Sequence, residues 1–335
     1  MQYLANMGLA QLASAFVITT VLSACGGGSS DPDPAPGGGD PDPVITDGNH
    51  RVSKIEYDYD LNGLIDARSI ITYSDNAKTV TSNYEYLGDG TPDIYIHGAD
   101  GIMARNEITF SDSGQQLTFS IENTKEDGSM TSITFSYSYR DDGQLQQIVI
   151  DTFGNSSVLD VLYSDGRISS LTDPNAVQPS LVYNYNANGT LASREIVNGG
   201  TITQRTDFIW RADGQLESAT SQNLYLDPVK NEYLTVVYDD GGKVDKFMQS
   251  NEQYPTTAAL NLTAIYTWDG DRIVEIGYDP LSQGGIDSIE TMTWEEGGCY
   301  NQYLPNLGLS LPNFISAQST VFTPGIFILN PVCAL

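Results

Sequence analysis

From residue 51 onward the sequence repeats a short pattern, and this repeat constrains the fold more than any other feature. Each unit has two aromatic or aliphatic residues separated by one residue, then turn-forming residues, a glycine and, a little later, Leu, Ile or Val. Ten units align on the glycines at positions 63, 90, 114, 143, 166, 189, 214, 242, 270 and 298, which lie 23 to 29 residues apart.

Each unit predicts a β-hairpin. Alternating aromatic residues lie on one face of a strand, and an Asp-Gly or Asn-Gly turn returns the chain as a second strand. Aliphatic residues after the turn can then pack beside the aromatics: Leu145, Ile168, Leu191, Leu216, Val244 and Ile273. The 20 Tyr and 32 Gly residues also favour strands joined by turns. We therefore expect an all-β fold over residues 50–298, an antiparallel β-meander or solenoid of about ten hairpins, too few for a closed shell.

The C-terminal segment, residues 299–335, leaves the repeat and becomes apolar. A solenoid needs a terminal cap over the open end of its core, and this segment has a suitable composition. Cys299 and Cys333 lie near its two ends and can form a disulfide in an oxidising compartment, or remain as two buried thiols.

The N-terminal residues 1–24 have the composition of an export signal, apolar up to Leu22-Ser23-Ala24-Cys25. That ending resembles the bacterial lipobox, which implies cleavage before Cys25 and lipid attachment to its thiol. The segment lacks the usual Lys or Arg before the apolar run, and the alternative is an uncleaved transmembrane helix. Gly26, rather than Asp, follows the cysteine, which by the same resemblance implies an outer-membrane lipoprotein.

Residues 25–49 are predicted to be a tether between the lipid and the folded body. Gly, Pro, Asp and Ser dominate this stretch, and no apolar face can be assembled from them. A flexible coil of this length has a root-mean-square reach of about 25–30 Å.

The repeat resembles the YD repeat of bacterial Rhs and WapA-type surface proteins and of the teneurins. The similarity covers about residues 52 to 298, and its best local instances are Tyr57-Asp58-Tyr59-Asp60 and Gly166-Arg167-Ile168. Most other units keep the aromatic, the turn glycine and the aliphatic residue but lack the Arg, so the repeat is a degenerate one. In large family members such repeats enclose a toxin, but only 37 residues follow Gly298 here.

Charge limits the possible partners. The chain has 43 Asp and Glu against 15 Lys and Arg, a formal net charge of −28. Such a surface repels phosphate backbones, which excludes nucleic acid as a partner and favours cations.

Two acidic turns suggest a calcium site. Asp58, Asp60, Asn62 and Asp66 occupy alternate positions around Gly63, and oxygen ligands in a tight turn can converge on one Ca²⁺. Asp89 and Asp93 form a similar Asp-Gly loop one unit later. The alternative is that both segments are ordinary hairpin turns.

The sequence contains none of the common catalytic motifs that we searched for, and His50 and His97 are its only histidines. We therefore expect a non-enzymatic cell-envelope lipoprotein, anchored in the membrane through Cys25, whose β-repeat surface binds a protein or glycan. Two alternatives stay open, an envelope glycan-cleaving enzyme with a carboxylate pair and a calcium-stiffened structural spacer.

Overall fold

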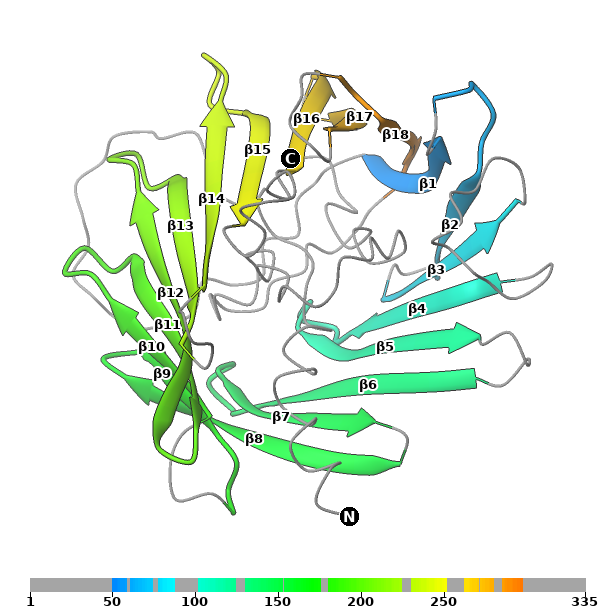
Figure 1. The fold of residues 1–335 in the computed structure, drawn as a ribbon. Coiled ribbons are helices and arrows are strands. Elements are labelled where there is room, and N and C mark those ends of the chain that lie inside the picture. Colours follow the sequence, from blue (N-terminus) through cyan, green and yellow to red (C-terminus); the bar gives the residue numbers. More distant parts are fainter. Residues whose placement is uncertain are drawn as a thin grey trace.

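A computed structural model of the chain describes residues 50–58, 61–74, 78–87, 102–124, 130–152, 154–175, 180–224, 230–251, 262–270, 272–279 and 285–297. These ranges form 18 β-strands in one antiparallel sheet (Figure 1). The prediction of an all-β fold is confirmed. No helix in this part of the chain has the length and hydropathy that a membrane span requires.

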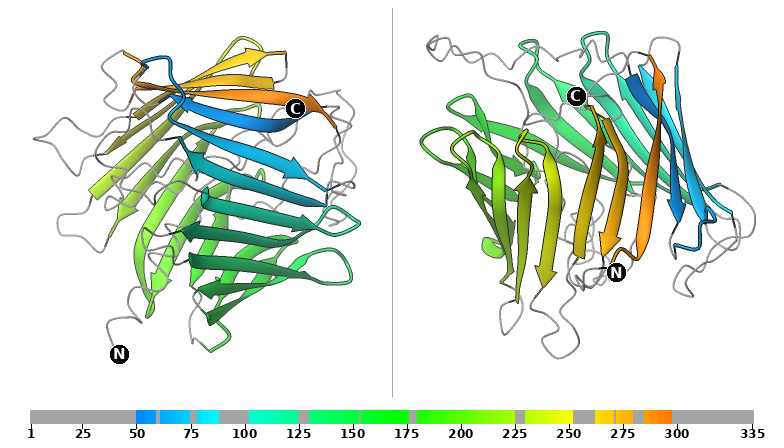
Figure 2. Two further views of the ribbon diagram at one scale, coloured as in Figure 1. Left: turned by 90° about the vertical axis from the view of Figure 1, so that its right-hand side faces the viewer. Right: turned by 90° about the horizontal axis from the view of Figure 1, so that it is seen from above.

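Each strand pairs with the next one along the sequence, as a meander requires (Figure 2). The strands are β1 (His50–Asp58), β2 (Ala67–Tyr73), β3 (Thr79–Tyr86), β4 (Ile102–Phe110), β5 (Gln116–Thr124), β6 (Met130–Tyr139), β7 (Leu145–Thr152), β8 (Asn155–Ser164), β9 (Arg167–Thr172), β10 (Leu181–Tyr185), β11 (Leu191–Asn198), β12 (Thr201–Trp210), β13 (Leu216–Asn223), β14 (Lys230–Tyr238), β15 (Val244–Asn251), β16 (Leu262–Asp269), β17 (Arg272–Asp279) and β18 (Ser288–Glu296).

The sheet closes on itself, because the last strand pairs with the first. The β1–β18 register runs from His50 opposite Glu296 to Asp58 opposite Ile289. The prediction of an open meander or solenoid of about ten YD-like hairpins with a C-terminal cap is therefore wrong, and the fold is a closed antiparallel barrel. Closure removes the two open edges, whose unpaired backbone groups would otherwise recruit other chains.

Strand β1 explains the error. The sequence pattern assigns Tyr57 and Gly63 to a first complete hairpin. In the structure, however, Val52 of β1 lies opposite Trp294 of β18, which is the arrangement of Leu216 opposite Trp210 in the hairpin β12–β13. Strand β1 is thus the second half of a hairpin whose first half is β18. The 18 strands make nine hairpins, and the ninth is assembled from the two ends of the described chain.

A β-bulge recurs in eight of the nine hairpins. In β12–β13, for example, the register shifts between Ile209 and Trp210, just after the turn on the opposite strand. The same shift occurs in the other seven. The exception is β2–β3, where Tyr73 pairs with Val80 without a shift. Because a bulge bends its strand and increases the local twist, this repetition curves the sheet.

Neighbouring hairpins are joined by a ladder of side-chain hydrogen bonds. In eight of the nine hairpins, the aromatic residue just before the turn donates a hydrogen bond from its hydroxyl or indole N–H. The acceptor is the carbonyl of the residue just after the turn of the preceding hairpin, at 2.6 to 3.0 Å. The eight donors are Tyr73, Tyr139, Tyr163, Tyr185, Trp210, Tyr238, Trp268 and Trp294. Phe110 occupies the ninth position and has no polar atom to donate.

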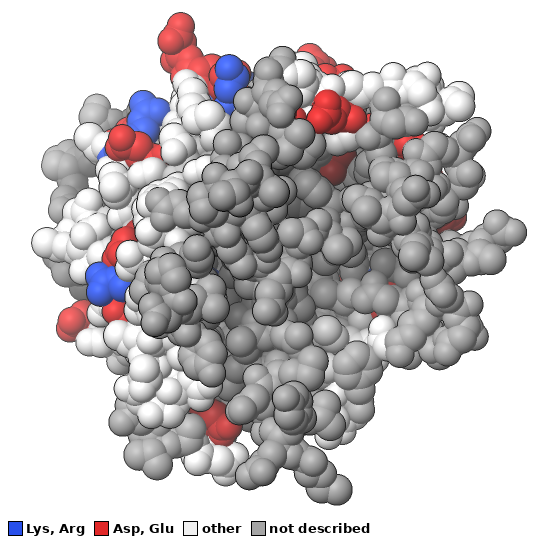
Figure 3. Space-filling view, in the orientation of Figure 1, with Lys and Arg blue, Asp and Glu red and all other residues white. Residues whose placement is uncertain are grey.

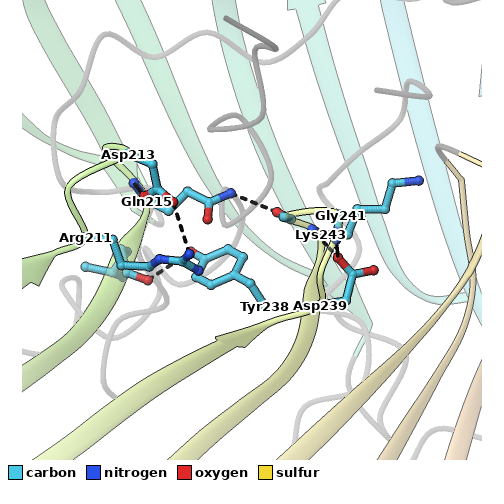
Figure 4. Close-up of polar contacts among 9 residues, drawn as sticks. Arg211, Asp213, Gln215, Tyr238, Asp239, Gly241 and Lys243 are labelled. Atoms are coloured by element: carbon cyan, nitrogen blue, oxygen red, sulfur yellow. Dashed lines mark hydrogen bonds and ion pairs between the residues drawn. The ribbon is translucent and has the colours of Figure 1, made fainter.

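Polar side chains reinforce the same junctions. Figure 4 shows Gln215 reaching the next turn, where its Nε2 donates to the Gly242 carbonyl at 2.8 Å. The guanidinium of Arg211 lies over the ring of Tyr238, 5.0 Å from its centroid. Such a cation–π contact contributes about 0.5–1 kcal/mol at an exposed site.

The two faces of the barrel wall differ in chemistry. On β6, Phe135 and Tyr137 are buried on the inner face, whereas Ser136 and Ser138 point outward. The outer face also carries cross-strand ion pairs such as Arg68–Glu85 at 2.8 Å and Arg205–Glu195 at 3.3 Å. Transmembrane barrels present the opposite arrangement, an apolar band outward. The outward positions named here carry polar and charged side chains instead.

The antiparallel order places successive connections at alternate rims of the barrel. The short-turn rim holds eight connections of two to five residues, 74–78, 111–115, 140–144, 165–166, 186–190, 211–215, 239–243 and 270–271. The long-connection rim holds nine, 59–66, 87–101, 125–129, 153–154, 173–180, 199–200, 224–229, 252–261 and 280–287. Because β1 begins opposite the end of β18, both ends of the barrel-forming chain lie at the short-turn rim.

Candidate functional site

A buried carboxyl group lies at the seam between the first and last strands. Glu290 of β18 is buried on the inner face, in the half of the wall toward the long-connection rim. Tyr57 of β1 lies directly opposite it on one side, and Ile276 of β17 lies opposite it on the other. Tyr266 of β16 continues the row beyond Ile276.

Tyrosines surround this carboxyl group. The hydroxyl of Tyr278, on β17, hydrogen-bonds to Glu290. The ring of Tyr57 is fully buried and meets the ring of Tyr84 edge to face, with centroids 5.8 Å apart. The side chain of Ser69 partly offsets the burial that raises the pKa of the Tyr57 hydroxyl. The seam therefore holds a buried cluster of one carboxyl and several hydroxyl groups, which we call the Glu290 cluster: Glu290, Tyr57, Ser69, Tyr84, Tyr266 and Tyr278.

Burial determines the protonation of the cluster. It raises the pKa of Glu290 to about 8, and the hydrogen bond from Tyr278 offsets only part of that effect. Burial, together with the nearby Glu290 carboxyl, also holds the pKa values of Tyr57 and Tyr278 well above the usual tyrosine value. At neutral pH Glu290 is therefore largely protonated and can donate as well as accept hydrogen bonds.

Four exposed apolar side chains lie on the three successive connections of this rim that adjoin the seam, β17–β18, β1–β2 and β3–β4. Leu61 and Leu64 of the β1–β2 connection are 40% and 51% exposed, and Leu87 and Ile286 are 44% and 37% exposed. The backbone N–H of Leu87 donates to the carbonyl of Asp66, which ties the start of the β3–β4 connection to the end of the β1–β2 connection. We call these four residues the rim patch.

Leu61 is also conformationally strained. Its φ of +57° lies in the left-handed region, which costs a bulky residue about 1–2 kcal/mol. Backbone strain of this kind tends to occur at functional sites. A strained, exposed leucine and three other exposed apolar residues on these connections mark this sector of the rim as a candidate interaction surface.

Three of the predicted calcium ligands, Asp58, Asn62 and Asp66, lie among the described residues. The Gly63 N–H donates to Asp58 Oδ2 at 3.0 Å, and the Leu64 N–H donates to Asn62 Oδ1 at 2.7 Å. Asp66 is fully buried, and Asp60, Asp89 and Asp93 lie outside the described residues. Among the described residues, no group of three or more His, Cys, Asp or Glu is placed to hold a metal ion. Asp58 and Asn62 stabilise the backbone of their own turn.

The other predicted residues fall mostly beyond the described ranges. Cys25, the proposed lipid site, and Cys299 and Cys333, the proposed disulfide, all lie outside them, as does His97. His50 begins β1 opposite Glu296. The signal, the tether and the C-terminal segment stay predictions.

Sequence reasoning missed both the Glu290 cluster and the rim patch. A signal for Glu290 was present, because Glu290, Met292 and Trp294 alternate along β18 and the two apolar members mark the inner face. A carboxyl on that face is a conspicuous exception to the pattern. The neighbouring tyrosines could be found only once the β1–β18 pairing was known.

Figure 3 shows acidic side chains spread around the perimeter of one face of the molecule, several with a basic side chain beside them. Ion pairs at the short-turn rim include Arg51–Glu295 at 2.7 Å and Arg211–Asp213 at 3.2 Å. These two arginines are thus paired locally, and the acidic excess of the chain determines the long-range field.

Comparison with known proteins gave no family model and no curated protein that matches the chain. Among solved structures, it is similar to a porin-like protein from Bacteroides uniformis, with 11% identity over 73% of this chain and 98% of that one, and a TM-score of 0.37. A porin-like protein from Bacteroides vulgatus matches with 11% identity, the same coverage and a TM-score of 0.27. Scores at this level do not establish a shared fold, so the description of the barrel depends on its own strand pairing.

Proposed function

We propose that the protein is a non-enzymatic binding scaffold of the cell envelope, anchored by lipid at Cys25, that presents its long-connection rim to a protein partner. The observation that carries this proposal is the position of the chain ends. Residue His50, where a tether would join the barrel, lies opposite Glu296 at the short-turn rim. A tether attached there leaves the long-connection rim as the end of the barrel farther from the point of attachment.

The chemistry of that rim favours a protein partner. The rim patch offers apolar area on neighbouring connections, and six of the nine connections at this rim have six or more residues. Binding residues occur disproportionately on loops held by a rigid scaffold. With a net charge of −28, the chain favours a partner that adds basic groups around an apolar contact.

Site-specific crosslinking tests the orientation. A photoreactive amino acid at Leu64 in the full-length protein, expressed in its own cells, should give a discrete adduct with another protein. The matched control is Ile209, an outward-facing residue of β12 that is 57% exposed beside the short-turn rim, and it should give none. Equal adducts from both positions, or adducts from Ile209 alone, would contradict the proposal.

The anchor is tested separately. Cys25→Ala should leave an unprocessed precursor and abolish incorporation of labelled lipid, because the thiol at this position is the only proposed acceptor. If labelling persists in this variant, the lipobox interpretation is wrong, whatever the result of the crosslinking.

A further inference from the structure

The inner face of the barrel is both apolar and covered. Inward side chains around much of the wall are almost fully buried, among them Ile108, Phe135, Leu145, Ile148, Ile150, Leu159, Leu171 and Leu234. An apolar surface of this extent is unfavourable in water, at about 25 cal/mol for each Å² exposed. Some part of the molecule must therefore lie against it.

The strands cannot cover this face themselves. Eighteen strands spaced about 4.8 Å apart and tilted as in known barrels enclose a circle roughly 35 Å across. About eight strands is the number at which inward side chains alone fill the interior. Consistent with this geometry, each described strand makes its substantial contacts only with its two neighbours in the ring. The cover must come from chain outside the strands.

The C-terminal segment is well suited to this role. The chain leaves β18 at the short-turn rim, at Gly297, and 37 residues follow Gly298. Residues 299–335 contain no Asp, Glu, Lys or Arg, although the whole chain has 58 such residues. The segment is rich in large apolar side chains, including Leu304, Leu307, Leu309, Leu311, Phe314, Ile315, Phe322, Ile326, Phe327 and Ile328.

The other end of the chain has the opposite chemistry. Residues 26–49, which join β1 at the same rim, are rich in Gly, Pro and Asp, so their transfer onto an apolar face is unfavourable. A closed ring also leaves no sheet edge for a cap to cover, which removes the role that the sequence first indicated for residues 299–335.

We propose that residues 299–335 enter the barrel from the short-turn rim and dock against its apolar inner face as an internal plug. The plug supplies apolar side chains that cover the inner face of the barrel. A bond between Cys299 and Cys333 would return the segment to the rim where it enters. This proposal is independent of the partner proposed above.

Intramolecular crosslinking tests the plug. A photoreactive phenylalanine analogue at Phe135, on the inner face of β6, should crosslink to a peptide within residues 299–335 when the purified full-length protein is irradiated and digested. The matched control is Ser136, the next residue on the same strand, which points outward and should give no such peptide. Crosslinks from Phe135 only to other segments, or none at all, would overturn the proposal.

A second measurement does not depend on the photoreactive residue. Leu309→Asp combined with Leu311→Asp should lower the melting temperature of the full-length protein by about 5–10 °C, because two charges would enter an apolar interior. It should also raise the fluorescence of a dye that binds apolar surface. Ala35→Asp, in the tether, is the control and should change neither. An unchanged melting temperature in the double variant would show that the segment lies outside the barrel.

Discussion

The two rims of the barrel are the two ends of the same repeated hairpins, but they differ in the length of their connections and in the exposure of their side chains. At the short-turn rim, connections span two to five residues, and aromatic donors tie each hairpin to its neighbour. At the long-connection rim, six connections have six or more residues, and the rim patch is exposed. The buried acidic residues among those described, Asp66, Asp279 and Glu290, all lie in the half nearer this second rim. One rim therefore holds the ring together, and the other is available for interaction.

The largest expected effect concerns Glu290. Its pKa is raised to about 8 in the fold, whereas an unfolded chain has a pKa near 4.5. Between these values the folded state holds the extra proton, so folding stability decreases as pH rises, by about 1.4 kcal/mol per pH unit. Glu290→Gln removes this contribution and should flatten the stability profile between pH 4.5 and 8, measured by urea unfolding.

The control for that profile is Glu275→Gln, which removes an outward-facing carboxyl from the neighbouring strand β17. It should retain the pH dependence of the unmodified protein. A Glu290→Gln profile that parallels the unmodified one would mean that Glu290 is ionised within the fold.

A second prediction tests the ladder at the short-turn rim. Trp268→Ala removes an inward ring, its N–H bond to the Val244 carbonyl at 2.8 Å and its contact with the Lys243 ammonium. The ring is only partly buried, so the change should cost about 2–3 kcal/mol, less than the loss of a fully buried tryptophan. Urea unfolding should show this loss, whereas Ile209→Ala, at an exposed outward position nearby, should change stability by less than about 0.5 kcal/mol.

The polar part of the ladder can be isolated by a smaller change. Tyr238→Phe deletes only the hydroxyl that donates to the Leu216 carbonyl at 2.9 Å, and should cost about 1 kcal/mol. Thr235→Val removes an exposed, outward-facing hydroxyl from the same strand and should cost less than about 0.5 kcal/mol. If both variants lose the same amount, the ladder adds nothing beyond the packing of the rings.

The smallest effect is expected at the long-connection rim. Leu64→Ser changes an exposed side chain, so its free energy of unfolding should stay within about 0.5 kcal/mol of the unmodified protein. A larger loss would mean that the rim patch contributes to the core, which would weaken the contrast between the rims.

Local structure was readable from the sequence because each hairpin is fixed by residues close together in the chain. The Asp165-Gly166 pair between Tyr163 and Ile168 predicts a tight turn, and both turn residues have positive φ in the structure, +52° and +74°. Closure could not be predicted in this way, because the β1–β18 pairing joins residues that are 231 to 246 positions apart in the sequence.

A local clue to closure was nevertheless present. Arg51-Val52-Ser53-Lys54-Ile55 follows the same order as Arg167-Ile168-Ser169-Ser170-Leu171, the half of a unit that comes after its turn. A chain that begins with the second half of a repeat needs the first half from elsewhere. The candidate site was hard to predict for the same reason, because the Glu290 cluster forms only where β1 and β18 pair.

The hairpin shared between the chain ends also dictates when folding can finish. Arg51 and Glu295, which form one of its ion pairs, are separated by 244 positions, and bringing such distant residues together costs about 5 kcal/mol of chain entropy. Early hairpins can form as they emerge from a ribosome or a translocation channel, but the ring stays open until β18 arrives. The export proposed above would use this order, because the barrel cannot become complete before nearly the whole chain has been delivered.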